Sequence, residues 1–193
     1  MPRLPADTVL MIVDLQKAID DSAWGPRNNP DAEERIAGLL AGWRAARMPV
    51  VHVRHDSPEA LSPYRPGGAG HAFKAQAMPV AGETIVGKSA RSAFIGTDLE
   101  ERLGGATTLV ICGVLTHHSV EATVRHAGDL GYRVFVPADA CWAIDVRDSA
   151  GRLWPAEDVH QLSLAVMDGE YARITNSMAV LDAVALARSR RQR

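Results

Sequence analysis

Apolar and polar positions follow two different patterns along the chain. Continuous apolar runs at residues 8–13 and 108–112 are typical of strands that are covered on both faces of a sheet. Shorter apolar runs, bounded by Gly, Pro or charged residues, predict further strands. These four strands are expected at residues 50–54, 83–87, 132–136 and 172–175.

The segments between these strands carry helical patterns. Ile36, Leu39, Leu40 and Trp43 recur at helical spacing, and Pro49 ends that helix. Asn29 and Asn176 are placed to cap the first and last helices, and Gly131 to end the third. The remaining patterns predict helices at residues 96–103, from about 117 to 130, 155–167 and from 177 to about 188.

Strands and helices therefore alternate, without an internal repeat or a linker. This alternation predicts an α/β fold in three layers, a six-stranded parallel sheet of Rossmann-like type with helices on both faces. A length of 193 residues fits one domain, and we assign residues 1–193 to it. Ligands of such open sheets bind at the carboxyl ends of the strands, so residues there are the first candidates for a site.

Composition narrows the class of function. A net charge of -2 argues against a nucleic-acid partner, and we interpret the basic run at residues 188–193 as a solvated terminus. No apolar stretch is long enough to span a membrane, and the N-terminus lacks the layout of a signal peptide. With only Cys112 and Cys141, no disulfide scaffold is indicated. We expect a cytoplasmic protein that acts on a small molecule.

Three polar residues follow predicted strands directly or stand in the turn after one. Asp14 follows the first strand, Lys88 the third, and Ser119 lies in the turn after residues 108–112. A carboxylate can take a proton from a nucleophile, and a nearby ammonium favours the ionised forms of both. Backbone N–H groups of the turn from Leu115 to Ser119 are placed to receive an oxyanion. Together these residues predict a site for nucleophilic catalysis.

Other candidates surround this set. Trp24 in the loop after the first strand and Trp142 after the fifth are expected to form walls for a substrate. The loop-rich segment 55–79 is longer than most connections, which is typical of functional or mobile loops. His52, His55, His71 and Asp56 fit no recognised metal-ligand spacing. We therefore predict no metal and no cofactor.

The chain resembles the isochorismatase-like, or cysteine hydrolase, superfamily over nearly its whole length. The motifs that carry the resemblance are IVDLQ (12–16), GKSARSAFIGTDL (87–99) and ICGVLTHHSVEAT (111–123), followed by GYRV (131–134) and ADAC (138–141). The resemblance implies a six-stranded parallel sheet and a triad of Asp, Lys and Cys. These map onto Asp14, Lys88 and position 119, with a non-proline cis peptide at Val114–Leu115.

The resemblance also implies a mechanism and an assembly. Asp14 accepts the proton of the nucleophile, Lys88 steadies the anion, and the N–H groups of Leu115 and residue 119 bind the oxyanion. Family members are usually dimers or tetramers, so a homodimer or homotetramer is expected. The residues expected to contact a small polar substrate with a flat or apolar part are Trp24, Asn28, His117, His118 and Trp142.

Position 119 departs from the pattern of the family's amidases, because this chain has serine where they have cysteine. Three interpretations follow. Ser119 is a Cys-to-Ser variant of an amidase, or the natural residue of an isochorismatase-type vinyl ether hydrolase that needs no thiol, or part of a catalytically silent ligand-binding homologue. Thr116 and the VEAT run at 120–123 resemble the cysteine-bearing amidases, so we favour an amidase acting on a small amide or carbamoyl compound.

Overall fold

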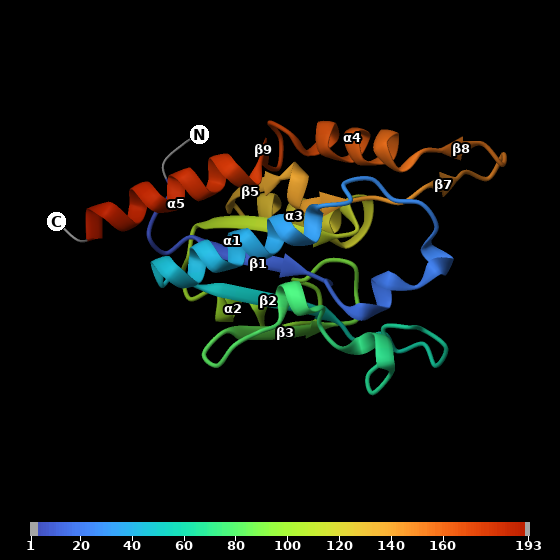
Figure 1. The fold of residues 1–193 in the computed structure, drawn as a ribbon, viewed down its shortest axis with the longest axis horizontal. Helices are drawn as coiled ribbons and strands as arrows, with labels where there is room; N and C mark the ends of the chain where they lie inside the picture. Colours follow the sequence, from blue (N-terminus) through green and yellow to red (C-terminus); the bar gives the residue numbers. More distant parts are fainter. Residues whose placement is uncertain (1–3, 192–193) are drawn as a thin grey trace.

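A parallel sheet forms the centre of the structure (Figure 1). This computed structural model describes residues 4–191, and its main sheet has the strand order β3-β2-β1-β4-β5-β9, with the short β6 paired to β4. All pairs in this sheet are parallel. The strands are β1 (Val9–Val13), β2 (Val50–His55), β3 (Thr84–Lys88), β4 (Thr108–Val114), β5 (Arg133–Pro137), β6 (Cys141–Trp142) and β9 (Arg173–Thr175).

Helices cover both faces of the sheet, which confirms the predicted fold class. α1 and α5 pack against each other on one face, and α3 and α4 contact each other on the opposite face. A small antiparallel hairpin of β7 (Val146–Arg147) and β8 (Leu153–Trp154) projects before α4 (Figure 1). The helices are α1 (Ala32–Ala46), α2 (Leu99–Arg102), α3 (Glu121–Asp129), α4 (Ala156–Met167) and α5 (Ser177–Arg191).

Single turns of helix complete the connections. The most important is a π turn, η5 (Thr116–Val120), which directly precedes α3. The 3-10 turns are η1 (Lys17–Asp20), η2 (Ser22–Trp24), η3 (Ala69–His71), η4 (Ala75–Ala77) and η6 (Ala138–Ala140).

The core lies around the two central strands. Every residue of β1 and β4 is buried, and the two strands pair from Val9–Leu109 to Val13–Gly113. This double-sided burial is the reason why both strands are continuous apolar runs in the sequence. Their shared end therefore reaches the edge of the sheet as a rigid support for the residues that follow it.

Local boundaries differ from the predicted ones where tertiary contacts override the local pattern. β4 continues through Gly113 to Val114 instead of breaking at Gly113, because a glycine tolerates the φ of 122° found there. Asn29 does not cap α1; its amide nitrogen donates to the carbonyls of Ala138 and Cys141, and Asp31 takes the cap position. The predicted cap at Asn176 is confirmed, since its side chain accepts from the N–H of Ala179.

A substitution at Gly113 tests how closely β4 packs against β1. A Cβ at this position would lie 2.2 Å from the carbonyl oxygen of Val13 in the paired strand. We expect Gly113→Ala to lower the free energy of unfolding by about 4 kcal/mol or more, because both the φ and the clash with backbone oppose it. Gly38→Ala is the matched control: Gly38 lies inside α1 with nothing within 4 Å, and roughly 0.5–1 kcal/mol of stabilisation is expected. Equal effects in urea unfolding contradict this account.

Two expectations concern the surface. Among the helices within residues 4–191, none combines the length and the apolar character needed to cross a membrane. The side chains of the basic run at residues 188–193 lie outside the part of the chain whose side chains are described.

Candidate active site

Three side chains from three strand ends meet at the carboxyl edge of the sheet. Asp14 follows β1 directly, Lys88 is the last residue of β3, and Ser119 lies in the π turn after β4. The Nζ atom of Lys88 donates to Oδ2 of Asp14 at 2.7 Å and to Oγ of Ser119 at 3.2 Å. The structure therefore brings together the three residues that the sequence predicts as a set.

Lys88 is held without access to solvent, since the exposed fraction of its side chain is 0%. Its ammonium also donates to the carbonyl oxygen of Ala90 at 3.1 Å and lies 3.4 Å from Nδ1 of His55. Burial lowers the pKa of Lys88, and the adjacent Asp14 carboxylate opposes that shift. A charge this deeply buried needs such partners, so Asp14 and Lys88 form one electrostatic unit.

One carboxylate oxygen of Asp14 has no hydrogen-bond partner among the residues that the structure describes. Its backbone has a φ of 53°, and its N–H donates to the carbonyl of Val53 in β2. Oδ2 accepts the hydrogen bond from Lys88, whereas Oδ1 is buried and has no hydrogen-bond partner within residues 4–191. A buried carboxylate oxygen without a partner is costly. It is also free to accept a proton from a group in the pocket.

The turn that carries Ser119 has an unusual backbone. The peptide bond between Val114 and Leu115 is cis, at the bond for which the family resemblance implies it. The N–H groups of His118 and Val120 donate to the carbonyl of Leu115 at 3.0 and 3.3 Å, which closes the turn tightly. Ser119 is 6% exposed and directed at Lys88.

Helix α4 supports this turn from behind. Oγ1 of Thr116 lies 2.9 Å from Nδ1 of His160, and Oγ of Ser163 donates to the carbonyl of Thr116. Both α4 residues are buried. Because the first residue of the turn is held through its side chain and its carbonyl, the position of Ser119 is determined by packing between α4 and the sheet.

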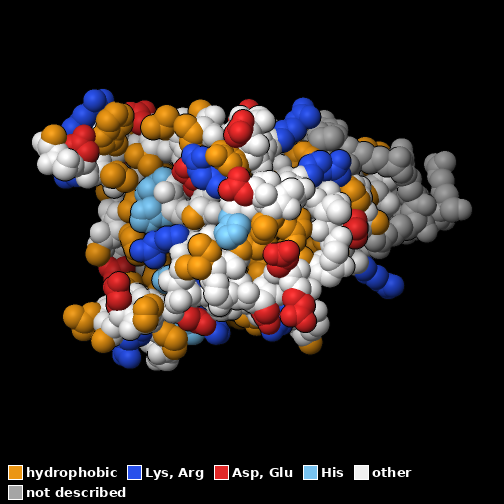
Figure 2. All heavy atoms as spheres, turned by 180° about the vertical axis from the view of Figure 1, so that it is seen from behind, with side chains coloured by type: hydrophobic (Ala, Val, Ile, Leu, Met, Phe, Trp, Pro, Cys, Tyr) orange, Lys and Arg blue, Asp and Glu red, His pale blue; other side chains and the backbone are white. Residues whose placement is uncertain are grey.

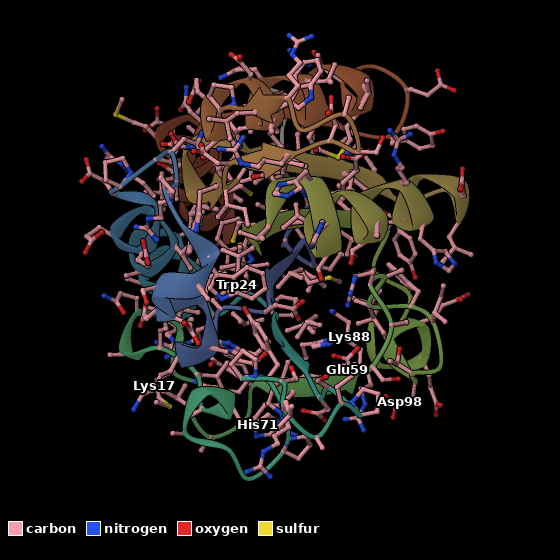
Figure 3. The ribbon with its side chains drawn as sticks, turned by 90° about the vertical axis from the view of Figure 1, so that its right-hand side faces the viewer. Lys17, Trp24, Glu59, His71, Lys88 and Asp98 are labelled. Atoms are coloured by element: carbon pink, nitrogen blue, oxygen red, sulfur yellow. The ribbon has the colours of Figure 1, made fainter. Side chains whose placement is uncertain are left out.

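A cavity of about 830 Å³ opens above these groups. Asp14, Ser119 and Leu115 are among the residues that line it. Figure 3 faces this edge of the sheet; Trp24 and Lys88 lie toward the centre of the view, whereas Lys17 and Asp98 lie toward its sides. The remaining walls come from four places in the chain, and their residues are Trp24, His55, 57–59, 61–64, 89–91, Val114 and His118.

The predicted substrate contacts divide into two groups. Trp24 and His118 line the cavity, as expected for walls of a site. Asn28, His117 and Trp142 do not line it. The side chain of Asn28 accepts from the N–H of Ala143 and donates to the carboxylate of Glu157, so both of its polar atoms have protein partners.

Of the other two residues, Trp142 is buried in the core and His117 is half-buried in the turn. Trp142 is 0% exposed and is stacked under the guanidinium of Arg27, with 4.4 Å between that group and the ring centre. His117 has a buried Nδ1 atom without a hydrogen-bond partner within residues 4–191, and burial lowers its pKa to about 4. Its ring packs against that of His118, 4.6 Å between centroids.

Part of the cavity wall could not be expected from the sequence. Tyr64 and His55 are each 9% exposed, and their rings meet edge to face with 5.6 Å between centroids. Leu61, by contrast, is 98% exposed at the rim. These residues belong to a segment without periodicity, so only its length marked it as functional. Gln16 ties this wall to the site through hydrogen bonds to the backbone of His55.

Two of the histidines, His52 and His71, have carboxylate partners. Nε2 of His52 lies 2.8 Å from Glu83, and Nε2 of His71 lies 2.6 Å from Asp56, which also pairs with Arg54. Within the described residues, no group of three or more His, Cys, Asp or Glu side chains is placed to hold a metal ion. The expectation of no metal stays a prediction.

The chain belongs to the isochorismatase family, whose domain matches residues 8–177. It is similar to the isochorismatase family protein YrdC of Bacillus subtilis (strain 168), 41% identical over 86% of this chain and 89% of the relative. A Chromobacterium violaceum protein described as a hydrolase of this family is similar in structure, with a TM-score of 0.92 and 48% identity over 96% of this chain and all of that one.

Two further relatives bear the name of an activity. The cysteine hydrolase from Pseudomonas syringae pv. phaseolicola has a TM-score of 0.87 and 26% identity, covering 97% of this chain and 96% of that one. Streptothricin hydrolase from Streptomyces noursei is 36% identical over 71% of this chain and 50% of its own length. The family and the fold together define an isochorismatase-family hydrolase.

Proposed function

We propose that this hydrolase cleaves a small amide or carbamoyl compound, with position 119 as the place of the nucleophile. The observation that carries the proposal is the contact of one buried ammonium, that of Lys88, with both Asp14 and Ser119. The resemblance to a cysteine hydrolase and to a hydrolase of streptothricin supports it.

The chemistry follows from the contacts. Asp14 takes the proton of the nucleophile through Oδ1, the oxygen that has no partner within residues 4–191. Lys88 stabilises the resulting anion, which attacks the carbonyl carbon of the substrate. The N–H groups of Leu115 and residue 119 bind the oxyanion. Asp14 then protonates the leaving amine, and water hydrolyses the acyl-enzyme.

The hydroxyl of Ser119 is a weaker nucleophile than a thiol at the same position. A thiol has a reference pKa of about 8.5, and an alcohol ionises far less readily. The site nevertheless favours an anion at position 119, because Lys88 donates to its side chain from a buried position. We therefore propose that the cysteine form of this site is the active amidase, and that Ser119 holds the place of that thiol.

A second candidate is an isochorismatase-type vinyl ether hydrolase. The observation that favours it is the hydroxyl at position 119 beside a carboxylate with a free oxygen, since protonation of a vinyl ether needs an acid and no thiol. Assaying the chain against a panel of small amides and against isochorismate separates the two: rapid loss of isochorismate by the serine form contradicts the amidase proposal. Binding without turnover in either form identifies a ligand-binding homologue.

The proposed reaction uses no metal ion. We expect prolonged treatment with a chelator to leave the activity of the active form unchanged, because His52, His71 and Asp56 are engaged with protein partners. The measurement is the hydrolysis rate before and after dialysis against EDTA. A loss that added zinc or iron restores contradicts the prediction.

We propose a cytoplasmic homodimer or homotetramer acting on a small molecule. Cys112 and Cys141 are free and buried, as suits a reducing compartment. Light scattering of the purified chain measures the assembly, and a monomeric mass contradicts it.

A further inference from the structure

One cation at the cavity has no carboxylate partner. Arg91 lines the cavity and is exposed, and no Asp or Glu within residues 4–191 forms an ion pair with it. Arg54, near the end of β2, differs because its Nε atom lies 2.8 Å from Oδ1 of Asp56. A guanidinium that faces a cavity without a counterion is available to an anionic ligand.

The backbone around Arg91 is anchored on both sides. The carbonyl of Ala90 accepts a hydrogen bond from Lys88, and the N–H of Ala93 donates to Oγ1 of Thr123 in α3. The hydroxyl of Ser92 contacts His126, also in α3. The base of the Arg91 side chain is thus tied to the catalytic lysine and to the helix that follows the nucleophile turn. This anchoring reduces the entropy lost when a ligand binds.

His118 lines the same cavity, and its ring nitrogens form no hydrogen bond or ion pair with the described residues. It directly precedes Ser119 in the chain. Burial, and next the positive charge of Arg91, lower the pKa of His118. The imidazole offers an N–H to a ligand in either protonation state. The charge of Arg91 also acts on His55 and Lys88. Figure 2 shows His and Lys or Arg side chains side by side at the end away from the grey residues.

The carboxylates of the cavity do not neutralise this arrangement. Asp14 is engaged by Lys88. Glu59 lines the cavity from the loop after β2 and is exposed, but forms no ion pair with Arg91. Trp24, Tyr64 and Leu61 add apolar and aromatic surface beside these charges.

We infer that Arg91 and His118 form an anion subsite, and that the substrate is a small amide bearing a carboxylate on a flat or apolar body. The carboxylate binds the guanidinium and the imidazole N–H, the body packs against Trp24 and Tyr64, and the amide reaches Ser119. This subsite specifies the substrate class of the proposed amidase. It rests on the proposed function only in that the ligand carries an amide at its other end.

Two ligands of one shape test the subsite. 4-Carbamoylbenzoate carries one amide and one carboxylate, whereas benzene-1,4-dicarboxamide replaces that carboxylate by a second, neutral amide. Isothermal titration with the serine form measures binding without turnover. We expect the carboxylate to bind about tenfold more tightly, and added salt to reduce the difference.

Substitutions test whether Arg91 causes the preference for the ligand that bears a carboxylate. Arg91→Gln is expected to abolish the roughly tenfold preference, and His118→Phe to reduce it. Arg65→Gln is the matched control, because Arg65 is an exposed arginine of the neighbouring loop that does not line the cavity. It removes the same charge and should leave the preference intact.

The outcomes separate this subsite from the proposed reaction. Equal binding of the two ligands, no detectable binding of 4-carbamoylbenzoate, or an unchanged preference in Arg91→Gln overturns the subsite, even where a cysteine form hydrolyses neutral amides. A preference that depends on Arg91 supports it, even where no form hydrolyses any amide and the amidase proposal fails.

Discussion

Replacing Ser119 by cysteine is expected to raise the hydrolysis of small amides by about 10²-fold or more, which corresponds to about 2.7 kcal/mol of activation free energy. The reason is local. Lys88 donates to the side chain at this position and stabilises an anion there, and a thiol ionises where an alcohol does not. The measurement is kcat/KM of the serine and cysteine forms on the same amide panel.

Labelling with a thiol reagent is the control that the gain in activity arises from the thiol at residue 119. Iodoacetamide should inactivate the Ser119→Cys form, with the label on residue 119. Cys112 and Cys141 are 0% exposed, and burial raises the pKa of Cys141 to about 12, so neither should react in the folded protein. Ser119→Ala is the matched variant without a nucleophile and should remain inactive. A cysteine form that gains nothing on amides contradicts the proposed amidase.

Replacing Asp14 by asparagine in the active form is expected to lower kcat by roughly 10²–10⁴-fold, the usual contribution of general acid–base catalysis. Asparagine keeps the shape and can still accept the hydrogen bond from Lys88, but its amide cannot carry the proton. Both the amide and the vinyl ether mechanism use this carboxylate. Turnover near the original rate therefore excludes both.

The stability of Asp14→Asn shows whether its loss of activity comes from lost catalysis or from unfolding. Asp14→Asn leaves the buried ammonium of Lys88 without its counterion, so we expect a loss of about 1–3 kcal/mol and a thermal midpoint several degrees lower. Unfolding should stay cooperative. Asp98→Asn is the control, because Asp98 lies in an exposed ion pair with Arg102 away from the cavity, and its kcat should not change.

The sheet and the central residues of the site could be predicted because local signals specify them. β1 and β4 are buried on both faces, which leaves uninterrupted apolar runs, and Asp14 stands at the end of the first of them. Lys88 ends the edge strand β3. Parallel strands end at one edge, so residues far apart in sequence were expected to meet there. The distances of 2.7 and 3.2 Å around Lys88 agree with that expectation.

The walls of the cavity could not be predicted in the same way, because long-range contacts decide them. Trp142 follows a strand and has the character of a substrate wall, yet a partner 115 residues earlier, Arg27, stacks over its ring. Tyr64 and Leu61 belong to a segment without periodicity. Only the folded chain shows that one packs on His55 and the other reaches the rim.

The most direct test of the nucleophile at position 119 is mass spectrometry of the Ser119→Cys form, quenched in acid during turnover of a small amide. The account predicts a mass increase equal to the acyl part of the substrate, located on the peptide that contains residue 119. The same increase should be absent when Asp14→Asn is added. Turnover without any acyl mass on that peptide contradicts covalent catalysis at this site.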